Sequence, residues 1–354
     1  MPIDLTLPEH GPHAIQLMID ALERELGSDI EVRRHVGAPI VSVADNYDRL
    51  RYRADDITRS RRYTRYVDDE HLMRSHTTAH LPGLLADPAT HAAGDVLLSV
   101  PGMCYRRDVI DRHHVAEPHQ HDLWRVRTSG PPLGDADLRE MIARVAGLVA
   151  PGRGWHTPDS PHPYTTGGRE IMVDDVEIGE CGLIHPQLLA DAGLGPGASG
   201  LAMGLGLDRL VMMVKGIPDV RLLRATDERI ASQMLDLEPY RPVSNRPPIR
   251  RDLSIAIDDP DPELLGDRIR DRLGVEVGIV EEIVVLADTP YEQLPAVART
   301  RMGMRPGQHN LLLRLVLRDH SRTLTDAQAN RVRDLVYAGV HEGSMGEWTA
   351  PPRT

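Results

Sequence analysis

Phenylalanine is absent from this chain of 354 residues, although tyrosine occurs nine times and tryptophan three times. Lysine is nearly absent too, because Lys215 is the only lysine among the 41 residues that are lysine or arginine. A GC-rich genome accounts for the shortage of lysine. It accounts poorly for the lack of phenylalanine, since one phenylalanine codon ends in C.

Cysteine is scarce as well. Only Cys104 and Cys181 occur, and they do not form a C-x-x-C pair. This excludes a dense disulfide framework and a zinc site built from cysteines, and a reducing cytoplasm is the expected compartment. The N-terminal segment is acidic and has no basic stretch followed by an apolar one, so neither a transit peptide nor a secretory signal is predicted.

Long apolar runs and excess positive charge are also missing. No stretch approaches the roughly 18 apolar residues of a membrane span, so no membrane partner is expected. The formal net charge of −12 excludes a uniformly basic surface, and any contact with RNA must use local patches. The composition, with 41% hydrophobic and 27% charged residues, is typical of a globular protein, and the length fits two domains.

Hydrophobic periodicity predicts the elements of the first two thirds of the chain. Apolar residues at steps of three and four predict helices over 14–26 and 135–149. Residues 95–128 are typical of an antiparallel hairpin, and 170–184 of further strands. Residues 200–215 begin glycine-rich and become apolar, which indicates a strand that leads into a helix.

The last third of the chain has a different pattern. Four prolines crowd residues 236–248, which indicates a linker. Beyond it we expect strands at 250–257, 279–286 and 309–318, helices at 262–273 and 325–341, and a short strand near 345–348. This βαββαβ order is that of the split βαβ or ferredoxin-like arrangement. We therefore predict a catalytic domain over 1–235, a linker over 236–248 and a second domain over 249–354.

The run Tyr105-Arg106-Arg107-Asp108 and the polar residues after it carry the strongest chemical signal. Arg106 and Asp108 are two residues apart and would share one face of a strand, where the arginine can bind a phosphate. Gln120 and Asp122, again two apart, would offer acceptors to an ammonium group. The alternatives are a polar hairpin with incidental histidines, or a metal site, which is weaker because the histidines lack regular ligand spacing: His113, His114, His119 and His121.

Two shorter runs add to this signal. In 204–210 (GLGLDRL) the glycines would let a nucleotide approach the backbone and Arg209 would meet phosphate, although tight packing is the simpler alternative. In 74–80 (RSHTTAH) hydroxyls and imidazoles suit an amino acid, although an ordinary Ser/Thr helix cap is common.

Six arginines are interleaved with three tyrosines between Arg51 and Tyr66. This pattern indicates either a patch that binds RNA phosphates and bases or a solvated loop, since Asp55 and Asp56 lie inside it. The residues that would contact tRNA are Arg59, Arg61 and Arg62.

These runs, in this order, resemble the phenylalanine–tRNA ligases, which are class II aminoacyl-tRNA synthetases. The chain is most similar to the single-chain organellar type or to an alpha-subunit-like form with a fused anticodon-binding domain. The resemblance covers nearly the whole chain, through 72–78, motif 2 at 105–120, motif 3 at 200–221, and 314–326. It implies an α+β fold with an antiparallel class II catalytic sheet flanked by helices, plus a C-terminal ferredoxin-like domain.

The resemblance also implies a reaction and its residues. The enzyme would activate phenylalanine or a related amino acid with ATP and Mg²⁺ and transfer it to tRNA, as a monomer or a homodimer. Catalysis would rest on Arg106 and Arg209. The residues implied for ATP are Arg106, Asp108, His114, Glu177, Gly206 and Arg209, with Glu177 holding the metal. Those implied for the amino acid are His76, Thr78, Gln120, Asp122, His162, Tyr164, Cys181, Gly182, Ala202 and Gly204.

The chain departs from the family pattern where the substrate ring would bind. The family has F-P-F, and this chain has His162-Pro163-Tyr164. Further departures are Leu81, Pro118, Thr166 and Met203. Buried polar groups need partners, so a substrate with its own polar group is one alternative, and continued stacking on a benzyl ring is the other.

Three functions remain open from the sequence. The first is the tRNA ligase itself. The second is a paralogue with altered amino-acid specificity or a non-tRNA acceptor, in a biosynthetic or resistance role, which would suit a protein made without phenylalanine. The third is an RNA-binding regulator, and the retained polar residues of the motifs count against it.

Overall fold

The computed structural model describes residues 3–243, 247–320 and 322–346. These residues form two compact units. The N-terminal unit comprises Met1–Arg106, Glu117–Pro218 and Ala231–Tyr240, and the C-terminal unit comprises Arg107–Ala116, Asp219–Ile230 and Arg241–Thr354. The loop 107–116, which lies inside motif 2, therefore belongs to the C-terminal unit, whereas the strands on either side of it belong to the N-terminal one.

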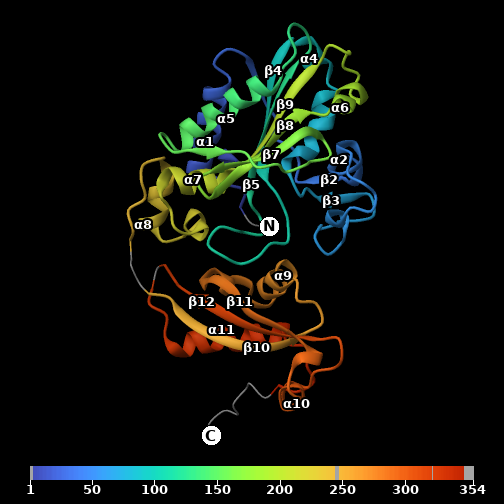
Figure 1. Ribbon diagram of the computed structural model, residues 1–354. Helices are drawn as coiled ribbons and strands as arrows, with labels where there is room; N and C mark the ends of the chain where they lie inside the picture. Colours follow the sequence, from blue (N-terminus) through green and yellow to red (C-terminus); the bar gives the residue numbers. More distant parts are fainter. Residues whose placement is uncertain (1–2, 244–246, 321, 347–354) are drawn as a thin grey trace. The chain divides into compact units, whose positions relative to one another are not determined.

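A seven-stranded sheet forms the centre of the N-terminal unit (Figure 1). The strand order is β1-β4-β5-β9-β8-β7-β6; β1 runs parallel to β4, and the other neighbours are antiparallel. The bounds are β1 Glu31–Arg34, β4 Asp95–Met103, β5 His119–Arg127, β6 Trp155–His156, β7 Thr165–Val173, β8 Val176–Ile184 and β9 Ser199–Gly206. A separate antiparallel pair consists of β2 (Ile40–Ser42) and β3 (His71–Met73).

Helices cover both faces of this sheet. Helices α1 (Ala14–Leu26), α5 (Asp135–Val149) and α7 (Leu207–Lys215) pack on one another and contact strands β4, β8, β5 and β9. On the other face, α3 (Leu81–Leu85) and α6 (Pro186–Asp191) join a core that includes Trp124 and Ala202. Helices α2 (Val43–Asn46) and α4 (Pro88–Ala92) also belong to this unit, whereas α8 (Glu228–Ala231) belongs to the C-terminal unit as far as Ile230.

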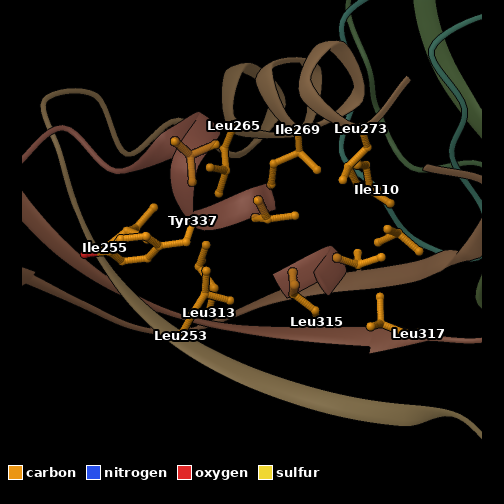
Figure 2. Packing of buried hydrophobic residues seen from close by; sticks show 14 of the residues in the cluster. Ile110, Leu253, Ile255, Leu265, Ile269, Leu273, Leu313, Leu315, Leu317 and Tyr337 are labelled. Carbon is orange, nitrogen blue, oxygen red and sulfur yellow. The ribbon is translucent and has the colours of Figure 1, made fainter. Parts of the chain in front are cut away.

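The C-terminal unit is a three-stranded antiparallel sheet with two main helices. Its strand order is β10 (Ile249–Ile257), β12 (His309–Leu317), β11 (Val280–Pro290). Helices α9 (Pro262–Leu273) and α11 (Asp326–Val340) pack on one another, and α10 (Ala296–Met302) is shorter. Figure 2 shows alternate residues of the strands, such as Leu313 and Leu315, facing Ile269 and Tyr337. Ile110, from the loop 107–116, completes this core.

Most of the predicted elements are confirmed. Helices α1, α5 and α9 have the predicted bounds, β4 and β5 form the expected hairpin, and β9 leads into α7. Thr325 and Gln328 form the expected capping box of α11. Residues 345–346 are not in a strand, and the rest of the predicted short strand lies outside the described residues.

The expectation that Arg106 and Asp108 share a strand face is wrong. Strand β4 ends at Met103, and Arg106 makes only a single bridge with Thr64. The two residues also belong to different units, because the chain enters the C-terminal unit at Arg107.

Candidate active site

Strand register brings the polar residues of three strands into one row. On β5 the period of two places Gln120, Asp122 and Trp124 on one face. Asp122 pairs with Gly204 of β9, and Gly204 pairs with Glu180 of β8. Because neighbouring strands are about 4.8 Å apart, the two carboxylates flank the glycine from Cα atoms about 10 Å apart.

Asp122 is a buried carboxylate that is surrounded by donors. The hydroxyl of Thr77 donates to it at 2.6 Å, the hydroxyl of Thr78 at 3.0 Å and the indole Nε1 of Trp124 at 3.0 Å. Burial raises the pKa of Asp122 to about 6, and these hydrogen bonds limit the rise. An anionic oxygen pair in this environment suits an ammonium group.

A cavity that is partly open to solvent lies over this row, with about 180 Å³ of space including the solvent at its mouth. Its wall is a series of stacked rings: Trp124 lies on Tyr164 with centroids 5.8 Å apart, and Tyr164 lies on His162 at 5.5 Å. The lining residues are Asp122, Trp124, His162, Tyr164, Thr165, Glu180, Cys181, Ala202, Met203 and Gly204.

His162 is held by Glu180. The imidazole Nε2 lies 2.8 Å from Oε2 of the carboxylate. Burial works to raise the pKa of Glu180, but the hydrogen bond with His162 and the nearby charge of Arg106 outweigh it, and the pKa falls below its ordinary value. Glu180 is therefore ionised at neutral pH.

The segment 74–80 lies beside Asp122 rather than capping a helix with its hydroxyls. His76 is the N-cap of a short 3₁₀ helix (Thr77–His80) but makes no side-chain cap bond, and the hydroxyls of Thr77 and Thr78 go to Asp122. Arg74 anchors the segment by donating to the carbonyl of Met103 at 2.9 Å. The helix-cap alternative is therefore wrong for these hydroxyls.

The imidazole of His76 makes no hydrogen bond to any described residue. Both ring nitrogens are buried, and neither has a hydrogen-bond partner among the described residues. The ring lies on Tyr52, with centroids 5.9 Å apart. Burial lowers the pKa of His76 to about 4, and the charge of Arg106 adds to this effect, so the imidazole is neutral.

The two arginines that the sequence predicted for catalysis have different surroundings. Gln120 pairs with Gly206, where β9 ends, and Arg209 lies in the first turn of α7. Arg209 donates to the carboxylate of Glu177 at 2.8 Å and to its carbonyl at 2.9 Å. The guanidinium of Arg106 has no hydrogen bond or ion pair to any described residue, although its charge acts on His76 and Glu180.

Asp108 and His114 lie in the C-terminal unit. Arg270 donates to the carbonyl of Asp108, and Asp108 caps the amide of Val109 at 2.8 Å. Nδ1 of His114 lies 2.7 Å from the carboxylate of Asp111. Within this unit the two predicted ATP residues are thus held by local contacts.

The proposed tRNA patch contains its own carboxylates. Arg59 lies over the ring of Tyr47 at 5.1 Å and pairs with Asp48 at 2.6 Å. Arg61 lies over Tyr66 at 4.8 Å and pairs with Asp69 at 2.8 Å, and Arg62 lies over Tyr63.

The small residues and the cysteine that the resemblance implied lie at or beside the cavity. Ala202 and Gly204 line it, and Gly182 lets Thr165 reach it, because a Cβ at position 182 would lie 2.7 Å from Thr165. Burial raises the pKa of the Cys181 thiol to about 12, so it lines the wall as an unreactive thiol. Within residues 3–243, 247–320 and 322–346, no group of three or more His, Cys, Asp or Glu side chains could hold a metal ion. In the same ranges no helix is long and apolar enough to cross a membrane.

Sequence reasoning missed four residues of the site. Tyr52 and Glu180 reach it only through long-range contacts. Trp124 shares the face of Gln120 and Asp122 through the period of two on β5, and Thr77 lies next to the predicted Thr78, so local patterns carried a signal for both.

The chain matches the family described as tRNA synthetases class II core domain (F) over residues 7–234. Its relatives include the phenylalanine–tRNA ligase, chloroplastic/mitochondrial, of Arabidopsis thaliana, which is 29% identical over 84% of this chain and 70% of the plant protein. The mitochondrial phenylalanine–tRNA ligase of Saccharomyces cerevisiae is 23% identical over 94% of this chain and 87% of the yeast protein. The phenylalanine–tRNA ligase alpha subunit of Lactobacillus delbrueckii is 31% identical over 65% of this chain and 71% of the subunit.

Proposed function

Because the chain belongs to the class II core family of tRNA synthetases (F), we propose that it is a ligase of the phenylalanine–tRNA ligase type. It activates phenylalanine or a related amino acid with ATP to form the adenylate, and transfers the acyl group to tRNA. The observation that carries this function is the set of groups around one cavity: Asp122 lines it and suits an ammonium, Arg106 acts by its charge on Glu180 of the same lining, and Arg209 is bonded to Glu177 on the strand that carries Glu180.

These groups suit the chemistry of adenylate formation. An amino-acid carboxylate attacks the α-phosphorus of ATP and pyrophosphate leaves, so the protein has to position the reactants and neutralise charge. Arg106 would bind the α-phosphate and the carboxylate, and Arg209 the γ-phosphate. His76, Thr78 and Gln120 would border the amino acid, and the roles of Asp108 and His114 toward the nucleotide stay predictions.

A magnesium ion fits this site only together with ATP. Glu177 offers one carboxylate, and Mg²⁺ commonly uses one or two carboxylates plus substrate phosphates. Glu177 would hold the ion, which supplies neutralising charge on the phosphates. Arg209, now paired with Glu177, would turn toward the γ-phosphate when the nucleotide binds.

The C-terminal unit is proposed to be a ferredoxin-like anticodon-binding domain that begins at 249, after the linker 236–248 and the catalytic domain 1–235. Support comes from the strand order β10-β12-β11 with α9 and α11, which equals the first five elements of βαββαβ. The tRNA patch at Arg59, Arg61 and Arg62, the monomer or homodimer, and the cytoplasmic location stay predictions.

The test is amino-acid-dependent exchange of pyrophosphate into ATP, followed by aminoacylation of total tRNA. We expect exchange with phenylalanine or a ring-bearing relative, and loss of exchange in Arg106→Ala. A chain that supports no exchange with any amino acid would overturn the proposed function. Exchange without tRNA charging would overturn only the acceptor.

A further inference from the structure

A continuous series of side-chain contacts runs around the cavity. Trp124 donates to Asp122, and the rings of Trp124, Tyr164 and His162 stack in that order. His162 in turn contacts Glu180, and Gly204 pairs with both Glu180 and Asp122, so it lies between the two carboxylates. A ligand that lies over Gly204 is therefore between two carboxylates and against a wall of rings.

The two carboxylates have different surroundings. Asp122 accepts from three side chains and lies on the strand that carries Gln120, toward the phosphate end of the site. Glu180 lies two strands away and accepts from His162 through Oε2. Its Oε1 has no partner among the described residues, and 43% of its side chain is exposed. Glu180 thus keeps an acceptor oxygen at the edge of the ring pocket.

We infer that Glu180, oriented by His162, binds a hydrogen-bond donor on the side chain of the amino-acid substrate. The inference rests on the proposed function, and it specifies the substrate class as a ring-bearing amino acid with a hydroxyl or amino group. The substrate ammonium lies at Asp122, the ring packs on Tyr164 and Trp124, and the donor meets Oε1 of Glu180.

A plain benzyl side chain fits this arrangement less well. It would cover Glu180 and remove water from an ionised oxygen without providing a donor, and an unpaired buried acceptor is destabilising. Sites that hydrogen-bond a substrate hydroxyl reject the analogue that lacks it by far more than apolar pockets reject an extra methylene. His162 acts here as a positioning residue, because its Nε2–H fixes one carboxylate oxygen and leaves the other for the ligand.

The experiment measures pyrophosphate exchange by the full chain with phenylalanine, tyrosine, meta-tyrosine and 4-aminophenylalanine. At least one donor-bearing amino acid should exceed phenylalanine in kcat/KM by about ten-fold or more. Glu180→Ala should remove most of that preference by raising KM for the donor-bearing amino acid, with kcat within about three-fold, because the lost contact serves binding. Glu180→Gln keeps the volume of the side chain, and its preference for the donor-bearing amino acid should lie between those of the wild type and of Glu180→Ala.

Glu170→Ala is the matched control. Glu170 pairs with Glu180 across β7 and β8 but does not line the cavity, so its loss should leave the preference unchanged. Phenylalanine used as well as every donor-bearing amino acid would overturn the inference and leave the proposed function intact. An equal loss for all substrates in both Glu180 variants would also overturn it, since Glu180 would then contact a group common to all amino acids. Absence of exchange with any amino acid overturns the proposed function, and the inference with it.

Discussion

The ionised carboxylate of Asp122, which is the form needed to bind an ammonium group, should destabilise the fold. Its pKa is raised from 3.8 to about 6, chiefly by burial, so the folded chain holds a proton more tightly than the unfolded chain. The stability that the protonated carboxyl contributes is complete below about pH 4 and is lost as the pH rises through about 6. At pH 8 the folded protein therefore carries the full penalty of the buried charge.

The size of the effect follows from the shift. About two units at roughly 1.4 kcal/mol per unit correspond to about 3 kcal/mol. Asn in place of Asp122 removes the charge and keeps an oxygen for Nε1 of Trp124. Its amide can donate to the hydroxyls of Thr77 and Thr78, which can turn to accept. Asp122→Asn should thus be more stable than the wild type by up to about 3 kcal/mol at pH 8, and should lose amino-acid activation.

The assay is urea unfolding of both proteins between pH 4 and pH 8, with pyrophosphate exchange on the same samples. Asp95→Asn is a control in which the change in stability at pH 8 should have the opposite sign. Burial works to raise the pKa of Asp95, but hydrogen bonds from Arg125 and Arg127 outweigh it and lower the pKa. Its ion pairs stabilise the fold above the unfolded pKa, and that stability is lost as the pH falls. Asp95→Asn should therefore be less stable at pH 8, with the difference shrinking toward low pH.

The reasoning is refuted if Asp122→Asn is no more stable than the wild type at pH 8, or if the difference between them is the same at pH 4 and pH 8. Exchange activity should also respond. In the wild type, kcat/KM for the amino acid should fall as the pH drops below about 6, because the protonated carboxyl no longer attracts an ammonium.

Three further predictions concern basic side chains. Arg106→Ala and Arg209→Ala should each lower exchange by about 30-fold or more, since a lost charge-assisted contact is worth about 2–3 kcal/mol, and unfolding midpoints should stay near wild type; near-normal exchange would contradict the assignment. The triple change to Ala at Arg59, Arg61 and Arg62 should weaken tRNA binding and flatten its salt slope by about one unit per lost phosphate contact, with exchange intact; an unchanged slope would identify a solvated loop. Lys215 is 1% exposed and donates to a carboxylate and two carbonyls of 236–238. Lys215→Met should therefore lower the free energy of unfolding, measured in urea, by about 2–3 kcal/mol. An unchanged free energy of unfolding would show that these hydrogen bonds do not stabilise the fold.

Local patterns predicted the elements well where one face of a helix or strand is buried. Helix α1 buries Ile15, Met18, Ile19 and Leu22, the residues that the three-and-four spacing selects. Gln120 and Asp122 were also predictable from local sequence, because the period of two in a strand places both side chains on one face of β5 independently of the rest of the chain.

Pairing between strands could not be predicted in the same way. Glu180 belongs to the cavity only because β8 pairs with β9 in the register that sets it opposite Gly204. A shift of one residue would have moved it to the other face. The pattern at Arg106 and Asp108 failed for a related reason: the chain passes to another packed unit at Arg107, and periodicity within four residues contains no sign of that exit.

The lack of phenylalanine has a structural consequence at the cavity, because every ring of its wall carries a polar atom. Its wall is made of Trp124, Tyr164 and His162, and each of these rings has a polar atom that a phenyl ring lacks. Two of them use that atom on the carboxylates that flank Gly204: Trp124 on Asp122, and His162 on Glu180. A phenyl ring at either position would keep the stacking but take away the carboxylate's partner. The rings of this wall therefore orient charge as well as pack, and a pocket built in this way distinguishes substrates by their donors as much as by their shape.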